Sequence, residues 1–95
     1  RRPVSAAARS LLATLALAML GRYPEAAKTG RRALAIFDRH GDQLAAGKIE
    51  LNLSNIAARR EEHREAQAFC SSAVARFDSI GETSWRTMAE NSLAN

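Results

Sequence analysis

Apolar side chains recur along the chain at spacings of three and four residues, the pattern of helices that pack by one face. In the clearest case the recurring positions are Ala46, Ile49, Leu53, Ile56 and Ala57. No alternating apolar run is long enough to favour strands. The pattern predicts helices near 5–20, 24–39, 43–60, 63–79 and 83–94. Because the links between them are very short, consecutive helices must run antiparallel.

Residues at the predicted helix ends support these boundaries. Gly41 and Gly81 follow periodic stretches and suit the left-handed residue that closes a helix. Asp42 and Thr83 can cap the helices that follow, and Pro24 suits a first helical turn, where its missing N–H is not needed. The sequence therefore predicts helix reversals close to these positions.

The chain matches itself at an offset of 40 residues. Laying 21–55 over 61–95 gives ten identities in 35 positions, against about three expected by chance in a chain this rich in alanine. The ten identical pairs are Glu25/Glu65, Ala26/Ala66, Ala33/Ala73, Ala35/Ala75, Phe37/Phe77, Asp38/Asp78, Gly41/Gly81, Glu50/Glu90, Leu53/Leu93 and Asn55/Asn95. Each copy spans two predicted helices, so the sequence predicts repeated helical hairpins.

The residues of these copies resemble a known repeat family. Gly21-Arg22-Tyr23-Pro24-Glu25-Ala26, followed by Ala33-Leu34, is similar to the helix-turn-helix signature of the tetratricopeptide repeat. Leu53-Ser54-Asn55, Glu65-Ala66 and Ala73-Val74 fall in register in the second copy, and Leu93-Ala94-Asn95 opens a third. The period of 40 resembles that of the long-period members in kinesin light chains and in bacterial regulator and sensor proteins. The second copy departs from the pattern at Glu61, in place of the turn glycine, and at His63, in place of the tyrosine.

The resemblance implies an all-α fold in which antiparallel helical hairpins stack as an α-solenoid. About two and a half repeats, or five helices, would form one unit over 1–95. Its helix pairs would be 5–39 and 43–79, and 83–94 would be the first helix of a third repeat. Such a stack curves, and the first helix of each pair lines its concave surface. Other helical-pair repeats, such as the armadillo type, are the structural alternative.

A polar stripe runs along the helix predicted at 43–60. Lys48, Asn52, Asn55 and Arg59 follow at intervals of four, three and four, so they share one face, about 120° from the apolar stripe. Asparagine amides can hold the main chain of an extended peptide, and the two cations can attract carboxylates. The next inner helix repeats the theme with Asn91 and Asn95, and the resemblance implies peptide contact by Asn55 and Asn95. The alternative is a solvated helix face without a ligand.

The first predicted helix is apolar on the face that would line the groove. That face carries Ala8, Leu11, Leu12, Leu15, Ala18 and Met19. An exposed apolar patch of this kind marks an interface, so we expect either a preceding repeat or self-association through Leu11, Leu12, Leu15 and Met19. The incomplete third pair leads to the same expectation at the other end, and homodimerisation through the truncated repeat ends is therefore predicted.

Composition narrows the classes of function. With 46% hydrophobic and 5% aromatic residues the chain reads as one globular unit, and a single cysteine, Cys70, fits a reducing, cytoplasmic location. The net charge of +4 comes from scattered arginine pairs followed by glutamates, which favours a solvated surface over nucleic-acid binding. The apolar run 11–20 is far shorter than the ~20 residues of a membrane span, and Arg9 interrupts it, so neither a span nor a targeting segment is expected.

No residues form a catalytic or metal-binding pattern. His40, His63 and Cys70 lack ligand spacing, and Cys70 shares the apolar side of its helix, where a buried small side chain is expected. We therefore expect no enzyme activity, no cofactor and no metal. The predicted function is a non-catalytic protein- or peptide-binding scaffold, part of a larger multidomain protein, whose partner is a protein or an extended peptide segment. The alternatives are a structural spacer or oligomerisation module and, less favoured, a nucleic-acid-binding helical module.

Overall fold

The computed structural model describes the backbone of residues 6–94 and the side chains of residues 8–92. Within that range the chain is helical, with no strand. The helices are α1 (Ala6–Met19), α2 (Tyr23–Arg39), α3 (Gln43–Arg59), α4 (His63–Ser79) and α5 (Thr83–Ala94). The predicted all-α class is confirmed, and the helix ends agree with the predicted ends to within one residue.

One kind of three-residue turn reverses the chain after each of the first four helices. Its central residue has a left-handed backbone, with φ between 60° and 78° at Gly21, Gly41, Glu61 and Gly81. After α2, Gly41 N donates to Asp38 O at 3.1 Å and Asp42 N donates to Phe37 O at 2.9 Å. Equivalent pairs of hydrogen bonds close the other three turns, so the carbonyls at each helix end are satisfied in the same way.

The residues that begin the helices agree with the sequence in two of three cases. Asp42 caps α3 by accepting a hydrogen bond from Ala45 N at 3.1 Å, and Pro24 lies in the first turn of α2. Thr83 is not a cap, because α5 begins at Thr83 itself and Glu82 takes the place that Asp42 has before α3.

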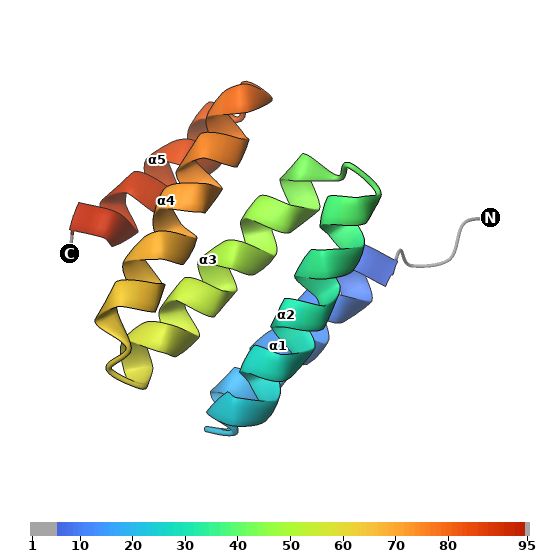
Figure 1. Ribbon diagram of the computed structural model, residues 1–95, viewed down its shortest axis with the longest axis vertical. Coiled ribbons are helices and arrows are strands. Elements are labelled where there is room, and N and C mark those ends of the chain that lie inside the picture. The colour runs from blue at the N-terminus through green and yellow to red at the C-terminus, as the bar shows by residue number, and fades with distance from the viewer. Residues whose placement is uncertain (1–5, 95) are drawn as a thin grey trace.

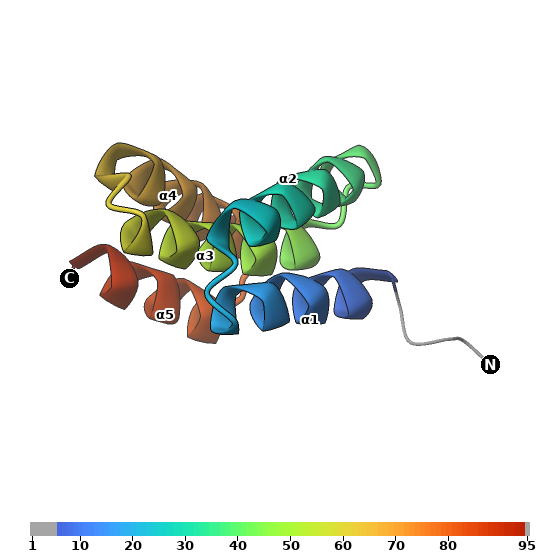
Figure 2. The same ribbon diagram turned by 90° about the horizontal axis from the view of Figure 1, so that it is seen from below.

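The helices lie on two sides of α3. Figure 1 shows each helix beside the next one in the chain, and Figure 2 shows α2 and α4 on one side of α3 with α1 and α5 on the other. The closest packing is between α3 and α4, and α1 touches α3 as well as α2. Because α3 is covered from both sides, its predicted apolar stripe is buried throughout, at Ala46, Ile49, Leu53, Ile56 and Ala57.

A close approach between α3 and α4 occurs at Gly47. A Cβ atom built there would lie 2.5 Å from Cε1 of Phe77, a ring that is fully buried. On its other side Phe77 packs on Trp85 of α5, with the ring centroids 5.7 Å apart. The absent side chain of Gly47 therefore provides the space for the ring that joins three helices, which outweighs the weak helix propensity of glycine.

A buried charge network also joins α3 to α4. The Glu50 side chain is 5% exposed. Its carboxylate accepts hydrogen bonds from Arg76 Nε at 2.9 Å and from Ser72 Oγ at 2.7 Å. Arg76 also donates to Gln43 Oε1 at 2.6 Å and lies 3.0 Å from Asp38 Oδ1. Burial by itself lowers the pKa of Arg76, but its hydrogen bonds and charge interactions with Asp38 and Glu50 raise that pKa above its usual value. Arg76 therefore stays charged and pairs the buried carboxylate.

The described residues on the outward face of α5 are polar. At an offset of 40, Ser84, Thr87 and Asn91 correspond to Leu44, Gly47 and Leu51 of α3, which pack near α4, and all three α5 residues are exposed. Glu90, at the place of Glu50, is exposed as well. Of these four positions only the glutamate is common to both copies, and the described residues of this face are polar.

Replacing Glu61 by glycine should stabilise the protein. A side chain in the left-handed region costs about 1 kcal/mol, and glycine removes that cost, so the melting temperature should rise by about 4–8 °C for a chain of this size. Gly41→Ala is the matched control, because a Cβ at Gly41 meets no atom within 4 Å and acts through the backbone alone. Thermal unfolding followed by circular dichroism should show opposite shifts for the two variants; equal melting temperatures would contradict the assignment of strain to Glu61.

Replacing Arg76 by methionine should destabilise the protein by about 3 kcal/mol at neutral pH, since it leaves the Glu50 carboxylate buried without a cation. Arg86→Met removes an exposed pair with Asp78 and should cost less than about 1 kcal/mol. Urea unfolding at neutral pH measures both variants, and a loss in Arg76→Met no larger than that in Arg86→Met would contradict the role given to the buried pair.

Candidate functional site

A groove runs beneath α3 on the side where α1 and α5 lie. It consists of two hollows of about 600 Å³ and about 290 Å³, which share the side chains of Leu15, Asn52 and Asn55. Because the reversals place α1 and α5 on the same side of α3, residues distant in the sequence line one surface. We call this surface the α3 groove.

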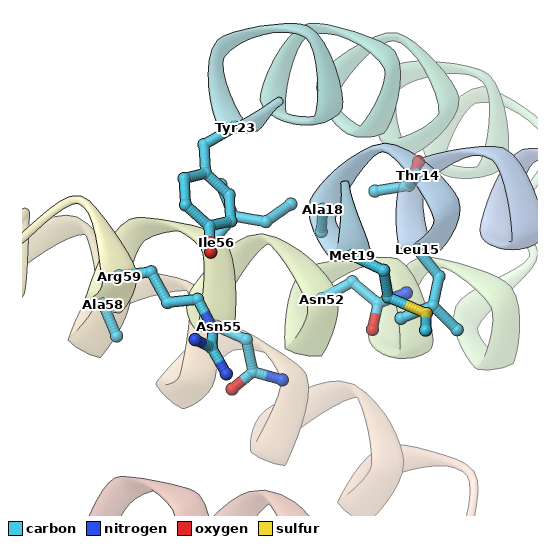
Figure 3. A pocket seen from close by; sticks show the side chains of 10 residues that line it. All are labelled: Thr14, Leu15, Ala18, Met19, Tyr23, Asn52, Asn55, Ile56, Ala58 and Arg59. Atoms are coloured by element: carbon cyan, nitrogen blue, oxygen red, sulfur yellow. The ribbon is translucent and has the colours of Figure 1, made fainter. Parts of the chain in front are cut away.

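The larger hollow lies between α1 and the C-terminal half of α3 (Figure 3). Its lining consists of Thr14, Leu15, Ala18, Met19, Tyr23, Asn52, Asn55, Ile56, Ala58 and Arg59. In the close-up the side chains of Asn55 and Arg59 lie side by side, and Asn52 lies beside Leu15 and Met19. Amide groups therefore face an apolar wall in this hollow.

The smaller hollow brings α5 into the groove. Its lining consists of Leu11, Leu12, Leu15, Lys48, Leu51, Asn52, Asn55, Trp85, Met88 and Ser92. Lys48 Nζ lies 4.8 Å from the centroid of the Trp85 ring, a cation–π contact that holds the ammonium at the edge of this hollow. The α5 helix therefore contributes an aromatic and an apolar side chain opposite the leucines of α1.

The predicted polar stripe on α3 lies entirely in the groove. Lys48, Asn52, Asn55 and Arg59 all line it, because their spacing keeps them on the side of α3 that faces α1 and α5. Asn91 is exposed on α5 but does not line either hollow, and Ser92 takes that place. At an offset of 40, Ser92 corresponds to Asn52 and Asn91 to Leu51, and one residue turns a helix by 100°. Asn95 lies outside the described residues.

The predicted self-association residues of α1 line the same groove. Leu12, Leu15 and Met19 are 62%, 46% and 80% exposed. Leu11 is half-buried and packs against the core around Phe37. The sequence predicts that the first helix of each pair lines one concave surface, and in the structure the apolar face of α1 lies across the α3 groove from the polar stripe of α3.

The groove is positively charged and its amides are open. Lys48 and Arg59 are the charged residues among those that line the two hollows, and no carboxylate lies between them. Within the described part of the chain, no hydrogen bond occupies the side-chain amides of Asn52 and Asn55. Unpaired amide groups at a half-open surface can pair with the main chain of a ligand.

Sequence reasoning expected the last helix to line the groove through Asn91 and Asn95, but it missed the α5 residues that line the smaller hollow. Trp85, Met88 and Ser92 follow at intervals of three and four, so they share a helix face, and this spacing was the available signal. Met88 and Ser92 also correspond to Lys48 and Asn52 at an offset of 40. Tyr23, the first residue of α2, joins the larger hollow for a different reason, because it follows the reversal that brings α2 against α1.

Comparison of the sequence and the structure with known proteins finds no relative. No protein-family model matches the chain, and neither the curated proteins nor the solved structures contain a match. The proposals below therefore rest on the residues of this chain.

Cys70, His40 and His63, which the sequence raised as candidates for catalysis or metal binding, lie in different surroundings. Cys70 is buried, as expected, its thiol donates to Ala89 O at 3.0 Å, and burial raises the pKa of this thiol. His40 and His63 are exposed residues at different turns. Among residues 6–94 no group of three or more histidine, cysteine or acidic side chains is arranged to hold a metal ion. None of the helices in that range combines the length and the apolar character that crossing a bilayer requires.

Proposed function

We propose that the chain is a non-catalytic scaffold of the tetratricopeptide-like kind, with hairpins stacked as a short α-solenoid, and that the α3 groove binds a segment of a partner protein. The observation that carries the proposal is the lining of the groove. Open amides on α3 face exposed leucine and methionine side chains on α1, and both lie along one continuous surface.

The architecture supports this proposal through its repetition. The same left-handed turn closes α1, α2, α3 and α4, and its central residues are Gly21, Gly41, Glu61 and Gly81, 20 residues apart. Two such helix-turn units span 40 residues, which is the period of the sequence match. Equal units that repeat in this way place alternate helices on one side, which is how helical repeats build a binding surface.

The physical character of the groove also supports peptide binding. Exposed apolar side chains gain free energy when a partner covers them, and about 25 cal/mol is gained for each Å² of apolar surface buried. The Asn52 and Asn55 amides give such a partner directional hydrogen bonds without requiring charge. A surface that combines both features is typical of sites that hold a polypeptide segment.

A selection from a random peptide library tests the proposal. Peptides enriched on the protein should perturb the backbone amide resonances of groove residues on α1, α3 and α5. The double variant Asn52→Ala with Asn55→Ala should weaken binding by about thirtyfold, since each of the two lost hydrogen bonds costs about 1 kcal/mol. Gln67→Ala, at an exposed position on α4 outside the groove, is the matched control. Enriched peptides that perturb only α2 and α4, or no enrichment at all, would contradict the proposal.

Self-association is the second candidate function, and the exposed side chains of α1 favour it. Leu12 and Met19 on this helix, and Leu20 directly after it, are each more than half exposed. If they form the interface between two copies, light scattering should show a dimer at high concentration, and Leu12→Glu with Leu20→Glu should return it to a monomer without loss of helical content. A monomer at every concentration would exclude this candidate and leave the groove free for another partner.

A further inference from the structure

A further hollow lies on the side of α3 that faces away from the α3 groove. Figure 2 shows α2 and α4 on that side. The hollow has a volume of about 290 Å³, and its lining comes from α2, α3 and α4, namely Arg31, Glu50, Glu65, Ala68, Phe69 and Ser72. Pockets for small molecules usually hold about 300–1,000 Å³, so this volume suits a single side chain better than a larger ligand. We call it the α2–α4 hollow.

The ion pairs around this hollow carry one negative charge in excess. Arg31 of α2 lies 3.1 Å from Glu65 of α4, and Arg76 of α4 lies 3.0 Å from Asp38 of α2. Glu50 of α3 also pairs with Arg76, at 2.9 Å. Three carboxylates therefore meet two guanidinium groups, although the net charge of the whole chain is +4. A bound cation would balance this network, so charge complementarity points to a positively charged occupant.

The two carboxylates that line the hollow can accept further hydrogen bonds. The Glu50 side chain is 5% exposed, and its oxygens accept one hydrogen bond each, from Arg76 and from Ser72. Glu65 Oε1 accepts from Arg31 at 3.1 Å, and within the described part of the chain no donor reaches Glu65 Oε2. A carboxylate has about four acceptor sites. A cation in the hollow would therefore find open acceptor sites on both groups.

The rim of the hollow already holds one cation by the chemistry that a second would use. The Arg31 guanidinium carbon lies 5.2 Å from the centroid of the Phe69 ring while its Nη2 atom pairs with Glu65. Ala68 and Phe69 add an apolar wall to the hollow. An aromatic ring beside a carboxylate attracts a cation, and a long side chain can lay its aliphatic stem on apolar surface while its charged end reaches polar atoms.

The open acceptor sites favour an ammonium over a guanidinium. Arginine binds a carboxylate best through two parallel hydrogen bonds, one to each oxygen. Both oxygens of Glu50 already have a donor, and so does one oxygen of Glu65. An ammonium is a compact charge whose three N–H donors can reach acceptors on separate groups. A lysine side chain therefore fits this hollow better than an arginine side chain.

We propose that the α2–α4 hollow binds a single lysine side chain of a partner protein, whose ammonium is received by the carboxylates of Glu50 and Glu65. The aliphatic stem of that lysine lies against Ala68 and Phe69. This site goes beyond the proposed function, because it uses none of the residues that line the α3 groove. A partner can therefore occupy the hollow while the groove is empty or filled.

Three blocked pentapeptides test the charge and the stem of the ligand. Each has lysine, arginine or norleucine at its centre between pairs of glycines, and is titrated into the protein at about 50 mM salt while backbone amide resonances are followed. The lysine peptide should perturb Ala68, Phe69 and Ser72 and bind about tenfold more tightly than the norleucine peptide, which lacks the charge. Equal binding of the norleucine peptide, or binding of the arginine peptide as tight as that of lysine, would overturn the assigned ligand.

Paired variants test the place of binding. Glu65→Gln should weaken the lysine peptide by about fivefold, whereas Glu25→Gln is the matched control, because Glu25 is the equivalent residue at an offset of 40 and lies outside the hollow. Ala68→Leu should abolish binding by filling the hollow, whereas Ala75→Leu places the same side chain two turns further along the exposed face of α4. Circular dichroism checks that each variant stays folded, and equal effects within either pair would overturn the site.

Two further measurements separate this inference from its alternatives. Free 1,4-diaminobutane has the same four-carbon stem as lysine, and tighter binding of this diamine than of the lysine peptide would overturn a partner protein as the source of the ammonium. Asn52→Ala with Asn55→Ala should leave binding of the lysine peptide unchanged, and a loss in that variant would overturn the α2–α4 hollow as the site. Conversely, Glu65→Gln should not affect peptides selected by the α3 groove, so each proposal can fail without the other.

Discussion

Each reversal of the chain depends on one residue in a left-handed backbone conformation. L-amino acids pay about 1–2 kcal/mol to adopt it, and glycine does not. Three of the four turns have glycine, and the fourth has Glu61 with the same pair of closing hydrogen bonds. Because the turns are alike and equally spaced, they place α1, α3 and α5 where they can line one surface. The α3 groove is a consequence of this constraint rather than of any single contact.

Packing between α3 and α4 determines how firmly the groove is held. The missing side chain of Gly47 leaves space for the Phe77 ring. Phe77 packs against Trp85, and Trp85 makes the cation–π contact with Lys48. The buried pair of Glu50 and Arg76 lies on the same interface and satisfies its own polar groups. A buried pair of this kind contributes little net stability but makes a shifted packing costly, because a shift would leave a charge unpaired. The α3 helix that lines the groove is therefore held in place by its packing against α4.

The apolar face of α1 and the polar stripe of α3 form the two sides of one groove. The amides and cations of α3 and the leucines of α1 face a common space, so a partner that covers the apolar wall also meets the polar stripe. Self-association and partner binding would consequently compete for α1. On the outer side of α5 the residues whose side chains the structure describes, Ser84, Thr87, Glu90 and Asn91, are polar.

Local pattern by itself determined the helices, their ends, the apolar stripe of α3 and the burial of Cys70, because these follow from helical periodicity and from the backbone preferences of glycine and proline. It also placed Lys48, Asn52, Asn55 and Arg59 on one face. Only the tertiary structure decided that Ser92 rather than Asn91 enters the groove and that Glu50 is buried with Arg76. The reason is physical: these results depend on which helix sides meet, and a turn of 100° per residue lets neighbouring residues differ completely in their surroundings.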